Sequence, residues 1–216
     1  MSKILLTICV SLLLVSTTYA GVIGNWENTT GDGWGGWISS SVVTATLPST
    51  LSNSATYAQS TIGATLGSYS LALTETGWMQ SLAISLNSTQ TADLKANTTF
   101  SIDVTVAASD GVYTSGYAQV YSVTLNAGGL GWQTISTSSP VLNYYFWSTA
   151  GQRTTTLTID YSAYASLITS TWSQIIITTN TSDGQTLYFD NAQFTPEPAT
   201  MALLGLGGLA LIRRKH

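Results

Sequence analysis

The side chains able to do chemistry in residues 21–194 are carboxylates, tyrosines and tryptophans. The single histidine, His216, and the single cysteine, Cys9, both lie outside this range. A serine–histidine–aspartate triad, a cysteine–histidine dyad and a histidine-ligated zinc or copper site are therefore excluded. A bound metal would take oxygen ligands, which favours calcium, although the sequence requires no cofactor.

The charge of this range is strongly negative. Nine acidic residues against two basic ones, Lys95 and Arg153, give a net charge of −7. Such a surface repels phosphate backbones, so nucleic acid is excluded as a partner. Solubility must come from serine, threonine, asparagine and glutamine instead of charge.

Strands are the elements expected to position these side chains. Strict alternation of apolar and polar residues, the pattern of a half-buried strand, runs through TTFSIDVTVAA and TTTLTIDYS. Similar runs are SYSLALT, QSLAISL, YAQVYSVTL, SQIIITT and QTLYFDNAQF. Only short helices are expected, around residues 89–96 and 162–169. About eight to ten strands in one domain predict an all-β sandwich or barrel.

The first 20 residues, MSKILLTICVSLLLVSTTYA, have the pattern of a secretory signal peptide. Lys3 precedes an apolar stretch, and the small residues Thr18 and Ala20 occupy the positions that determine cleavage. We predict cleavage after Ala20. The alternative is a membrane helix that stays uncleaved, for which the apolar stretch is short.

The chain ends in TPEPATMALLGLGGLALIRRKH, which joins three features. The tripeptide of Pro196, Glu197 and Pro198 comes first. An apolar run and a basic cluster follow, made up of Met201, Leu203, Leu204, Leu206, Leu209, Leu211 and Ile212, then Arg213, Arg214 and Lys215. As a helix the apolar run would reach about 18 Å, which is short of the roughly 30 Å core of a bilayer.

This tail resembles the PEP-CTERM sorting signal of exported proteins in Gram-negative bacteria that make extracellular polysaccharide. The resemblance implies processing by an exosortase-type enzyme after transient insertion into the inner membrane, with the basic cluster on the cytoplasmic side. It also implies a final place on the envelope surface or in the extracellular matrix. A plain tail anchor is the alternative. The predicted divisions are a signal peptide (1–20), a β-sandwich (21–194) and a sorting signal with a short apolar helix (195–216).

A second resemblance covers most of residues 21–194. The segments NWENTTGDGWGGW, GSYSLALT and LYFDNAQF are similar to segments of jelly-roll carbohydrate-binding modules with a galactose-binding-like fold. The resemblance implies a jelly-roll β-sandwich whose first and last strands lie side by side. It also implies a structural calcium ion shared by Glu27, Asp190 and the loop of Asp32. The alternative is that backbone N–H groups hold Glu27 and Asp190.

Tryptophans and tyrosines are the candidate glycan contacts, because aromatic faces stack on sugar rings. Trp34 and Trp37 lie in a glycine-rich loop that cannot bury both of them. In the segment YTSGYAQVY, alternation places one set of side chains on one face, away from Ala118 and Val120. That set is Tyr113, Tyr117, Gln119 and Tyr121.

Two carboxylates and two further tryptophans complete these expectations. Asp103 and Asp160 alternate with apolar residues in their own strands, so we expect them to join the tyrosines in a polar glycan groove. A solvated sheet face with cross-strand aromatic pairs is the alternative. Trp26 and Trp172 fall within strand patterns and are expected in the core.

Three functions are compatible with this pattern. The first is an exported, non-enzymatic surface or matrix protein whose β-sandwich binds polysaccharide. The second is a purely structural surface protein without a small ligand. The third is a glycoside hydrolase that uses Glu27 and Glu75 as its carboxylate pair, although their contexts, NWENT and LTETG, do not resemble the motifs of such enzymes.

Overall fold

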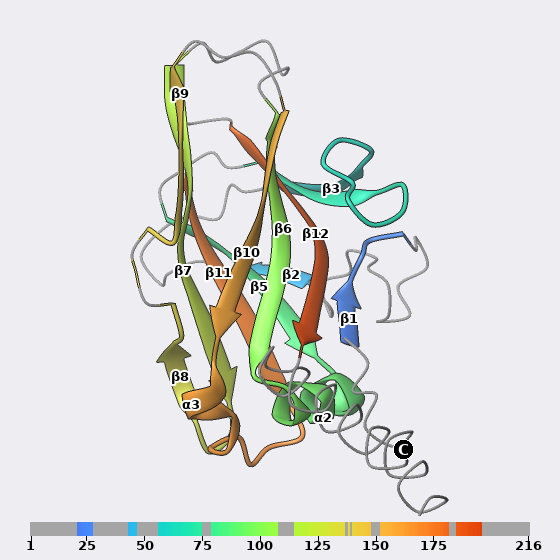
Figure 1. Ribbon diagram of the computed structural model, residues 1–216, viewed down its shortest axis with the longest axis vertical. Coiled ribbons are helices and arrows are strands. Elements are labelled where there is room, and N and C mark those ends of the chain that lie inside the picture. The colour runs from blue at the N-terminus through green and yellow to red at the C-terminus, as the bar shows by residue number, and fades with distance from the viewer. Residues whose placement is uncertain are drawn as a thin grey trace, which may run out of the picture.

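The computed structural model describes residues 21–27, 43–46, 56–74, 79–107, 115–136, 138, 140–147, 152–181 and 185–195, mostly as antiparallel strands (Figure 1). Sheet A contains β1 (Gly21–Gly24), β3 (Thr56–Ser60), β4 (Ser70–Thr74), β6 (Thr99–Ala107), β10 (Gln152–Asp160) and β12 (Thr186–Thr195). Sheet B contains β2 (Val43–Thr46), β5 (Gln80–Leu86), β7 (Ser115–Ala127), β8 (Gly131–Thr134), β9 (Leu142–Trp147) and β11 (Ser173–Thr181).

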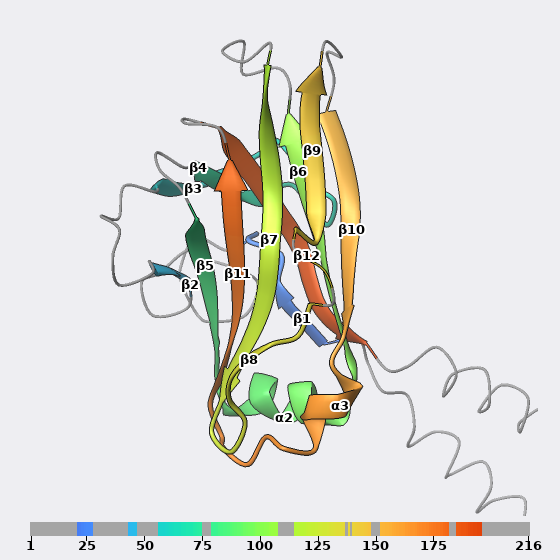
Figure 2. The same cartoon turned by 90° about the vertical axis from the view of Figure 1, so that its left-hand side faces the viewer.

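The order of the strands is that of a jelly roll. Sheet A runs β10-β6-β12-β4-β3 with β1 also paired to β12, and sheet B runs β2-β5-β11-β7-β8 with β9 also paired to β7. The chain passes from one sheet to the other at each step from β4 to β7 and again from β9 to β12. Four strands of sheet A, β4-β12-β6-β10, thus face β5-β11-β7-β9, as in two interlocked Greek keys (Figure 2). The predicted all-β jelly-roll sandwich is confirmed.

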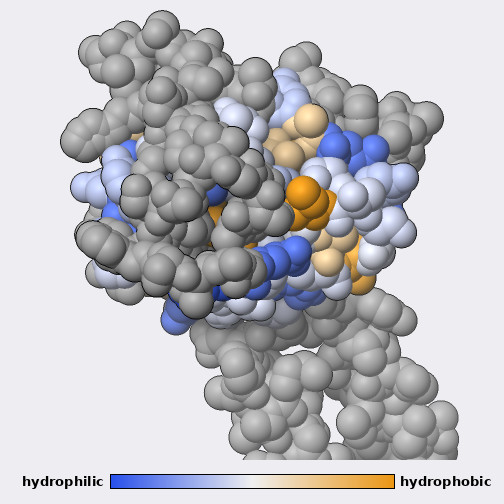
Figure 3. All heavy atoms as spheres, turned by 90° about the horizontal axis from the view of Figure 1, so that it is seen from above, coloured by the Kyte–Doolittle hydropathy of each residue, from blue (hydrophilic) through white to orange (hydrophobic). Residues whose placement is uncertain are grey.

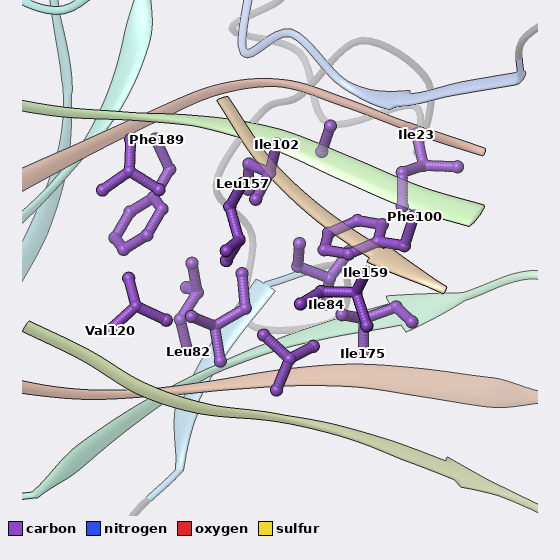
Figure 4. Packing of buried hydrophobic residues seen from close by; sticks show 14 of the residues in the cluster. Ile23, Leu82, Ile84, Phe100, Ile102, Val120, Leu157, Ile159, Ile175 and Phe189 are labelled. Carbon is purple, nitrogen blue, oxygen red and sulfur yellow. The ribbon is translucent and has the colours of Figure 1, made fainter. Parts of the chain in front are cut away.

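The hydrophobic core fills the space between the two sheets. Figure 4 shows Phe100 and Ile102 of β6 directed toward Leu82, Ile84 and Ile175 of sheet B. All five side chains are buried, as the alternation in TTFSIDVTVAA and the apolar runs of sheet B predict. Because these residues come from strands far apart in sequence, the core joins the two sheets into one unit.

A bulge in β7 changes which side chains face the core. Thr178 pairs with Ser122 while Thr179 pairs with Val120, so Tyr121 is an extra residue opposite β11. Before the bulge Val120 is buried, and after it Val123 is buried. An extra residue of this kind reverses the alternation, so the apolar residues of YAQVYSVTL stay on the core side along the whole strand.

The first and last strands of the described chain are neighbours. Strand β1 pairs antiparallel with β12, with Gly21 opposite Phe194. The last half of β12 therefore lies between β1 and β6, and its first half lies between β4 and β6. The expectation that the start and the end of the domain lie side by side is confirmed.

Two short helices cover one end of the sandwich, α2 (Ser88–Ala96) and α3 (Ser162–Ala165) (Figures 1 and 2). Asn87 caps the start of helix α2: its side-chain oxygen accepts from the backbone N–H of Gln90, and its own N–H donates to the side-chain oxygen of Gln90. This capping box satisfies two otherwise unpaired N–H groups. The buried hydroxyl of Tyr161 donates to the carbonyl of Leu94 at 2.9 Å and ties the start of α3 to α2.

Of the two tryptophans expected in the core, one is buried and the other is exposed. Trp26 is 1% exposed, as expected, with its backbone carbonyl accepting from Gln59. Trp172 is 50% exposed, so that expectation is wrong. It stands one residue before β11, and the inward position belongs to Ser173, whose hydroxyl bonds that of Thr91 on α2 at 2.9 Å.

Candidate functional site

Two buried carboxylates lie opposite each other on the outer face of sheet A. Asp103 of β6 pairs with Asp190 of β12, and both are at most 7% exposed. The hydroxyl of Thr65 is 2.6 Å from Asp103 Oδ2 and 3.3 Å from Asp190 Oδ2. Asn191 Nδ2 donates to Asp103 at 3.2 Å. We call these four residues the carboxylate cluster.

The position of Asp103 differs from the expectation that it shares a glycan groove with the tyrosines. Asp103 lies in sheet A, whereas Tyr117 and Tyr121 lie in sheet B. Its other oxygen, Oδ1, accepts from the hydroxyl of Thr156 at 2.5 Å. Asp160 also lies in sheet A, at the exposed end of β10. The predicted groove of tyrosines, Gln119 and these carboxylates is therefore not formed.

One loop, residues 61–69, holds two carboxylates through its backbone amides. The N–H groups of Thr65 and Leu66 donate to Asp190 Oδ2 at 2.6 and 2.7 Å. The N–H groups of Ser68 and Tyr69 both donate to Glu27 Oε1 at 2.6 Å. Glu27 follows β1 and Asp190 lies in β12, so this loop fastens both ends of the domain to β4.

Glycine is required where this loop approaches Glu27. Gly67 has a φ of +85°, in the left-handed region that favours glycine. A Cβ atom on Gly67 would lie 2.5 Å from the Cδ of Glu27. The bare backbone thus lets the N–H groups of Ser68 and Tyr69 reach the carboxylate.

The described contacts of Glu27 and Asp190 match the alternative in which backbone N–H groups hold these two carboxylates. Three of the four carboxylate oxygens already accept N–H groups, because Asp190 Oδ1 also takes the N–H of Asn191 at 2.7 Å. These N–H groups already supply part of the positive charge that a calcium ion would bring to the carboxylates. Among the described residues no group of three or more acidic, histidine or cysteine side chains could hold a metal. Asp32, the third predicted ligand, lies outside the described residues.

The predicted hydrolase pair is only half described. Glu27 is held by two amides, which matches the alternative of a carboxylate fixed by backbone N–H groups. Glu75 lies outside the described residues. Glu27 therefore has a structural task, which gives no support to a role as catalytic acid or nucleophile.

Burial raises the pKa of the Asp190 carboxyl above its ordinary value. The amides of Leu66, Thr65 and Asn191 and the Thr65 hydroxyl oppose this rise, because they stabilise the charged form. Desolvation is the larger effect, so the buried anion destabilises the fold at neutral pH relative to its protonated form.

A second group of polar residues lies on the outer face of sheet B. Gln119 of β7 donates to Asn143 of β9 at 3.1 Å and accepts from Asn180 of β11 at 3.1 Å. Tyr117 is half-buried and Tyr121, the bulge residue, is 36% exposed. The inward neighbours Ala118 and Val120 are fully buried, as the alternation predicts. We call Tyr117, Gln119, Tyr121, Asn143 and Asn180 the tyrosine–amide face.

One buried amide oxygen of this face is unpaired among the described residues. Asn180 is 7% exposed, and its Oδ1 has no hydrogen-bond partner in the described part of the chain. Buried polar atoms are nearly always paired with protein or with ordered water. Asn143, at the other end of the same row, is exposed. Amide groups in a row beside an aromatic ring can bind a ligand rich in hydroxyl groups.

Several predicted site residues lie outside the described residues. They are the loop tryptophans Trp34 and Trp37, Tyr113, the metal candidate Asp32, and the whole tail with Pro196, Glu197 and Pro198, its apolar run and its basic cluster. Of the predicted glycan contacts, the structure describes Tyr117, Gln119 and Tyr121 and brings them together in β7. The sequence did not point to Asn143 or Asn180, because their pairing to Gln119 depends on the register of three strands.

Two exposed tryptophans were not predicted from the sequence. Trp132 in β8 is 65% exposed, and Trp172 before β11 is 50% exposed. The segment GLGWQT, with glycines on both sides of Leu130, is a turn signal that places Trp132 at the start of a strand.

Figure 3 shows the end of the sandwich opposite to the helices. The described surface there is mainly hydrophilic or neutral, with a few hydrophobic residues between.

Comparison with known families identifies the tail. Residues 194–215 match the PEP-CTERM protein-sorting motif. The PEP-CTERM motif indicates a secreted protein that is sorted to the cell surface. This confirms the resemblance seen in the Pro-Glu-Pro tripeptide, the apolar run and the basic cluster. No helix in the described ranges is both long and apolar enough to cross a membrane.

No curated protein matches the sequence of the chain. Its fold is similar to that of several carbohydrate-binding modules at low identity. The C-terminal family 22 module of Clostridium thermocellum Xyn10B is 16% identical, with a TM-score of 0.45 over 83% of this chain and 94% of that module. The CBM22-1 xylan-binding domain of Paenibacillus barcinonensis Xyn10C is 14% identical, with a TM-score of 0.43 over 82% and 91%. The mannan-recognising module TmCBM27 is 12% identical, with a TM-score of 0.42 over 72% and 88%.

Proposed function

We propose that this protein is exported, sorted through its PEP-CTERM tail, and binds neutral polysaccharide at the cell surface or in the extracellular matrix through the tyrosine–amide face. The observation that carries the proposal is the row of amides Asn143, Gln119 and Asn180 beside the exposed ring of Tyr121. A ring offers a flat apolar surface to the C–H face of a sugar, and amides offer donors and acceptors to its hydroxyl groups.

Charge favours a neutral polymer over an anionic one. Residues 21–194 carry nine acidic and two basic residues, so an acidic polysaccharide would be repelled. Amide and phenol groups, in contrast, bind hydroxyl groups without any charge. A neutral chain of pyranose rings fits both features of the face.

The PEP-CTERM tail implies a processing enzyme as a partner. We propose that an exosortase-type enzyme of a Gram-negative-type envelope processes the chain near Pro196, Glu197 and Pro198 after transient insertion of the apolar run. The basic cluster would stay on the cytoplasmic side by the positive-inside bias. Changing Glu197 to Ala in the native host, followed by size analysis of the surface fraction, tests this step. Accumulation of an unprocessed form supports it, whereas unchanged size and location contradict it.

Binding is tested with the full chain purified in mild detergent, by electrophoresis through gels that contain soluble xylan, galactomannan or alginate. We expect retardation by a neutral polymer and none by anionic alginate. Tyr121→Ala should weaken retardation about tenfold, the loss of roughly 1.4 kcal/mol. Tyr69→Ala is the matched control, because the ring of Tyr69 is 37% exposed but lies on the loop of sheet A.

Two outcomes contradict this assignment. If Tyr121→Ala and Tyr69→Ala behave like the unchanged chain while a polymer still binds, the tyrosine–amide face is not the site. If the folded chain binds no neutral polymer, the alternative of a purely structural surface protein replaces polysaccharide binding.

A further inference from the structure

A pair of exposed tryptophans lies at the helical end of sheet B, away from the tyrosine–amide face. Trp132 is 65% exposed and Trp172 is 50% exposed, whereas Trp26 is 1% exposed. Leu167, also 50% exposed, belongs to the same loop as Trp172. Large aromatic side chains are usually mostly buried, so two at this exposure at one end of a sheet need a reason.

The backbone holds these tryptophans in a fixed place. The turn between β7 and β8 and the loop of residues 166–172 bond each other at Gly128. Its N–H donates to Ser170 Oγ at 2.9 Å, and its carbonyl accepts from the N–H groups of Thr169 and Ser170 at 2.9 and 3.2 Å. Figures 1 and 2 show β8 and α3 at this same end of the sandwich.

Glycine makes this close contact possible. Gly129 has a φ of +86°, and a Cβ there would lie 2.6 Å from the carbonyl oxygen of Leu167. The two segments are thus locked together at backbone level, which leaves little freedom to bury the tryptophan rings by a loop movement. Preorganised aromatic groups lose little entropy when a ligand binds.

A polar row connects the two tryptophans. Trp132 pairs with Asn126, and Asn126 pairs with Gln174, so the three residues lie across β8, β7 and β11. Asn126 Nδ2 donates to Gln174 Oε1 at 3.0 Å, and Gln174 Nε2 donates to Ser85 Oγ at 3.2 Å. Trp172 comes two residues before Gln174. The rings therefore flank a floor of amides instead of an apolar groove.

The spacing suits a chain of sugar rings. Two strand separations and two residues of strand length place the Cα atoms of Trp132 and Trp172 about 12 Å apart. An extended chain of a few pyranose rings can contact both rings at once and turn its hydroxyl groups toward Asn126 and Gln174 between them. The arrangement repeats, with different residues, the ring-and-amide chemistry of the tyrosine–amide face.

We infer that Trp132 and Trp172 form a second contact surface for neutral polysaccharide, separate from the tyrosine–amide face. This inference rests on the proposed function for the class of ligand. The amide floor favours a ligand rich in hydroxyl groups over an apolar protein segment. The excess of acidic residues opposes an anionic membrane surface. Two surfaces about six residues apart along β7 and β11 would let one long chain bind at both and gain avidity.

The test uses the full chain in mild detergent and two neutral probes, soluble xylan and galactomannan. The double variant Trp132→Ala, Trp172→Ala should weaken retardation in gels of the binding polymer by at least about tenfold. The matched control is Trp132→Phe, Trp172→Phe, which keeps flat rings and should retain most of the binding. Near-ultraviolet circular dichroism checks that each variant is folded.

The outcomes separate this inference from the proposed function. Loss with the tryptophan pair and not with Tyr121→Ala supports the second surface and contradicts the tyrosine–amide face. Loss with Tyr121→Ala alone overturns the second surface and leaves the proposed function intact. Binding of neither probe overturns both. A change from dimer to monomer in light scattering, with unchanged polymer binding, would identify the tryptophans as a contact between copies and also overturn the inference.

Discussion

Asp103 and Asp190 lie directly opposite each other on β6 and β12, with the hydroxyl of Thr65 within 3.3 Å of both carboxylates. The hydroxyl has one proton, which it donates mainly to Asp103 at 2.6 Å and shares weakly with Asp190 at 3.3 Å. Like charges opposite each other on neighbouring strands repel. The sandwich tolerates this pair because amides of loop 61–69 and of Asn191 surround Asp190.

Removing the Asp190 carboxylate should destabilise the fold. Asp190→Ala leaves the N–H groups of Thr65 and Leu66 without their acceptor in a buried place, and we expect a loss of about 2–4 kcal/mol in the free energy of unfolding. Urea denaturation followed by tryptophan fluorescence measures it. The control is Asp160→Ala, whose exposed carboxylate accepts from Ser162 N–H and should cost less than about 1 kcal/mol. Equal losses for the two variants would contradict this account of the loop.

Stability should depend on pH through Asp190. Because its pKa is raised in the folded protein, the folded state binds the proton more tightly than the unfolded state. This contribution is fully present below the unfolded pKa of about 3.9 and is lost as the pH rises through the folded pKa. Asp190→Asn should therefore remove a fall in stability with rising pH in that window, seen as a difference between the two unfolding curves. Parallel pH profiles would show that Asp190 does not titrate differently on folding.

Two glycines offer a matched comparison of backbone strain and close contact. Gly67→Ala places a Cβ 2.5 Å from Glu27, whereas Gly131→Ala meets nothing within 4 Å, and both residues have positive φ. We expect about 1–2 kcal/mol of destabilisation for Gly131→Ala and at least about 1 kcal/mol more for Gly67→Ala. Thermal unfolding of the two variants provides the measurement. A smaller loss at Gly67 would mean that the Glu27 carboxylate moves aside without cost.

Removal of divalent metal should leave stability unchanged. Glu27 and Asp190 are bonded to amides, so they do not need calcium to neutralise them. We expect the midpoint of thermal unfolding to shift by less than about 1 °C between EDTA and calcium. A clear rise with calcium that disappears in Asp32→Asn would place a cation site at Asp32, outside the described residues.

The strands were predictable because their signals are local. The alternation around Phe100 and Ile102 gives the buried face of β6 directly. The tail was predictable for the same reason, because its motif is contiguous.

The contacts between distant segments were not predictable. Asp103 alternates with apolar residues as a solvated residue would, yet loop 61–69 and Thr156 bury it. No local sequence pattern indicates that this loop covers Asp103. Trp172 lies in a segment with the composition of a strand. The pairing of β11 with β7 begins one residue later, at Ser173 and Ala127, and leaves Trp172 outside the strand. Asn180 reaches Gln119 only because the bulge at Tyr121 sets the register of β7 on β11.

The position of β12 determines how the domain would respond to force. Residues 196–216 follow directly after Thr195, so tension on a retained tail would pull β12 along its own axis. Strand β12 is bonded to β6 on one side and to β4 and β1 on the other. Tension along that axis would shear many hydrogen bonds together instead of opening them one after another. A surface protein held by its last residues would therefore transmit load into the centre of sheet A, where rupture requires the cooperative failure of several strands.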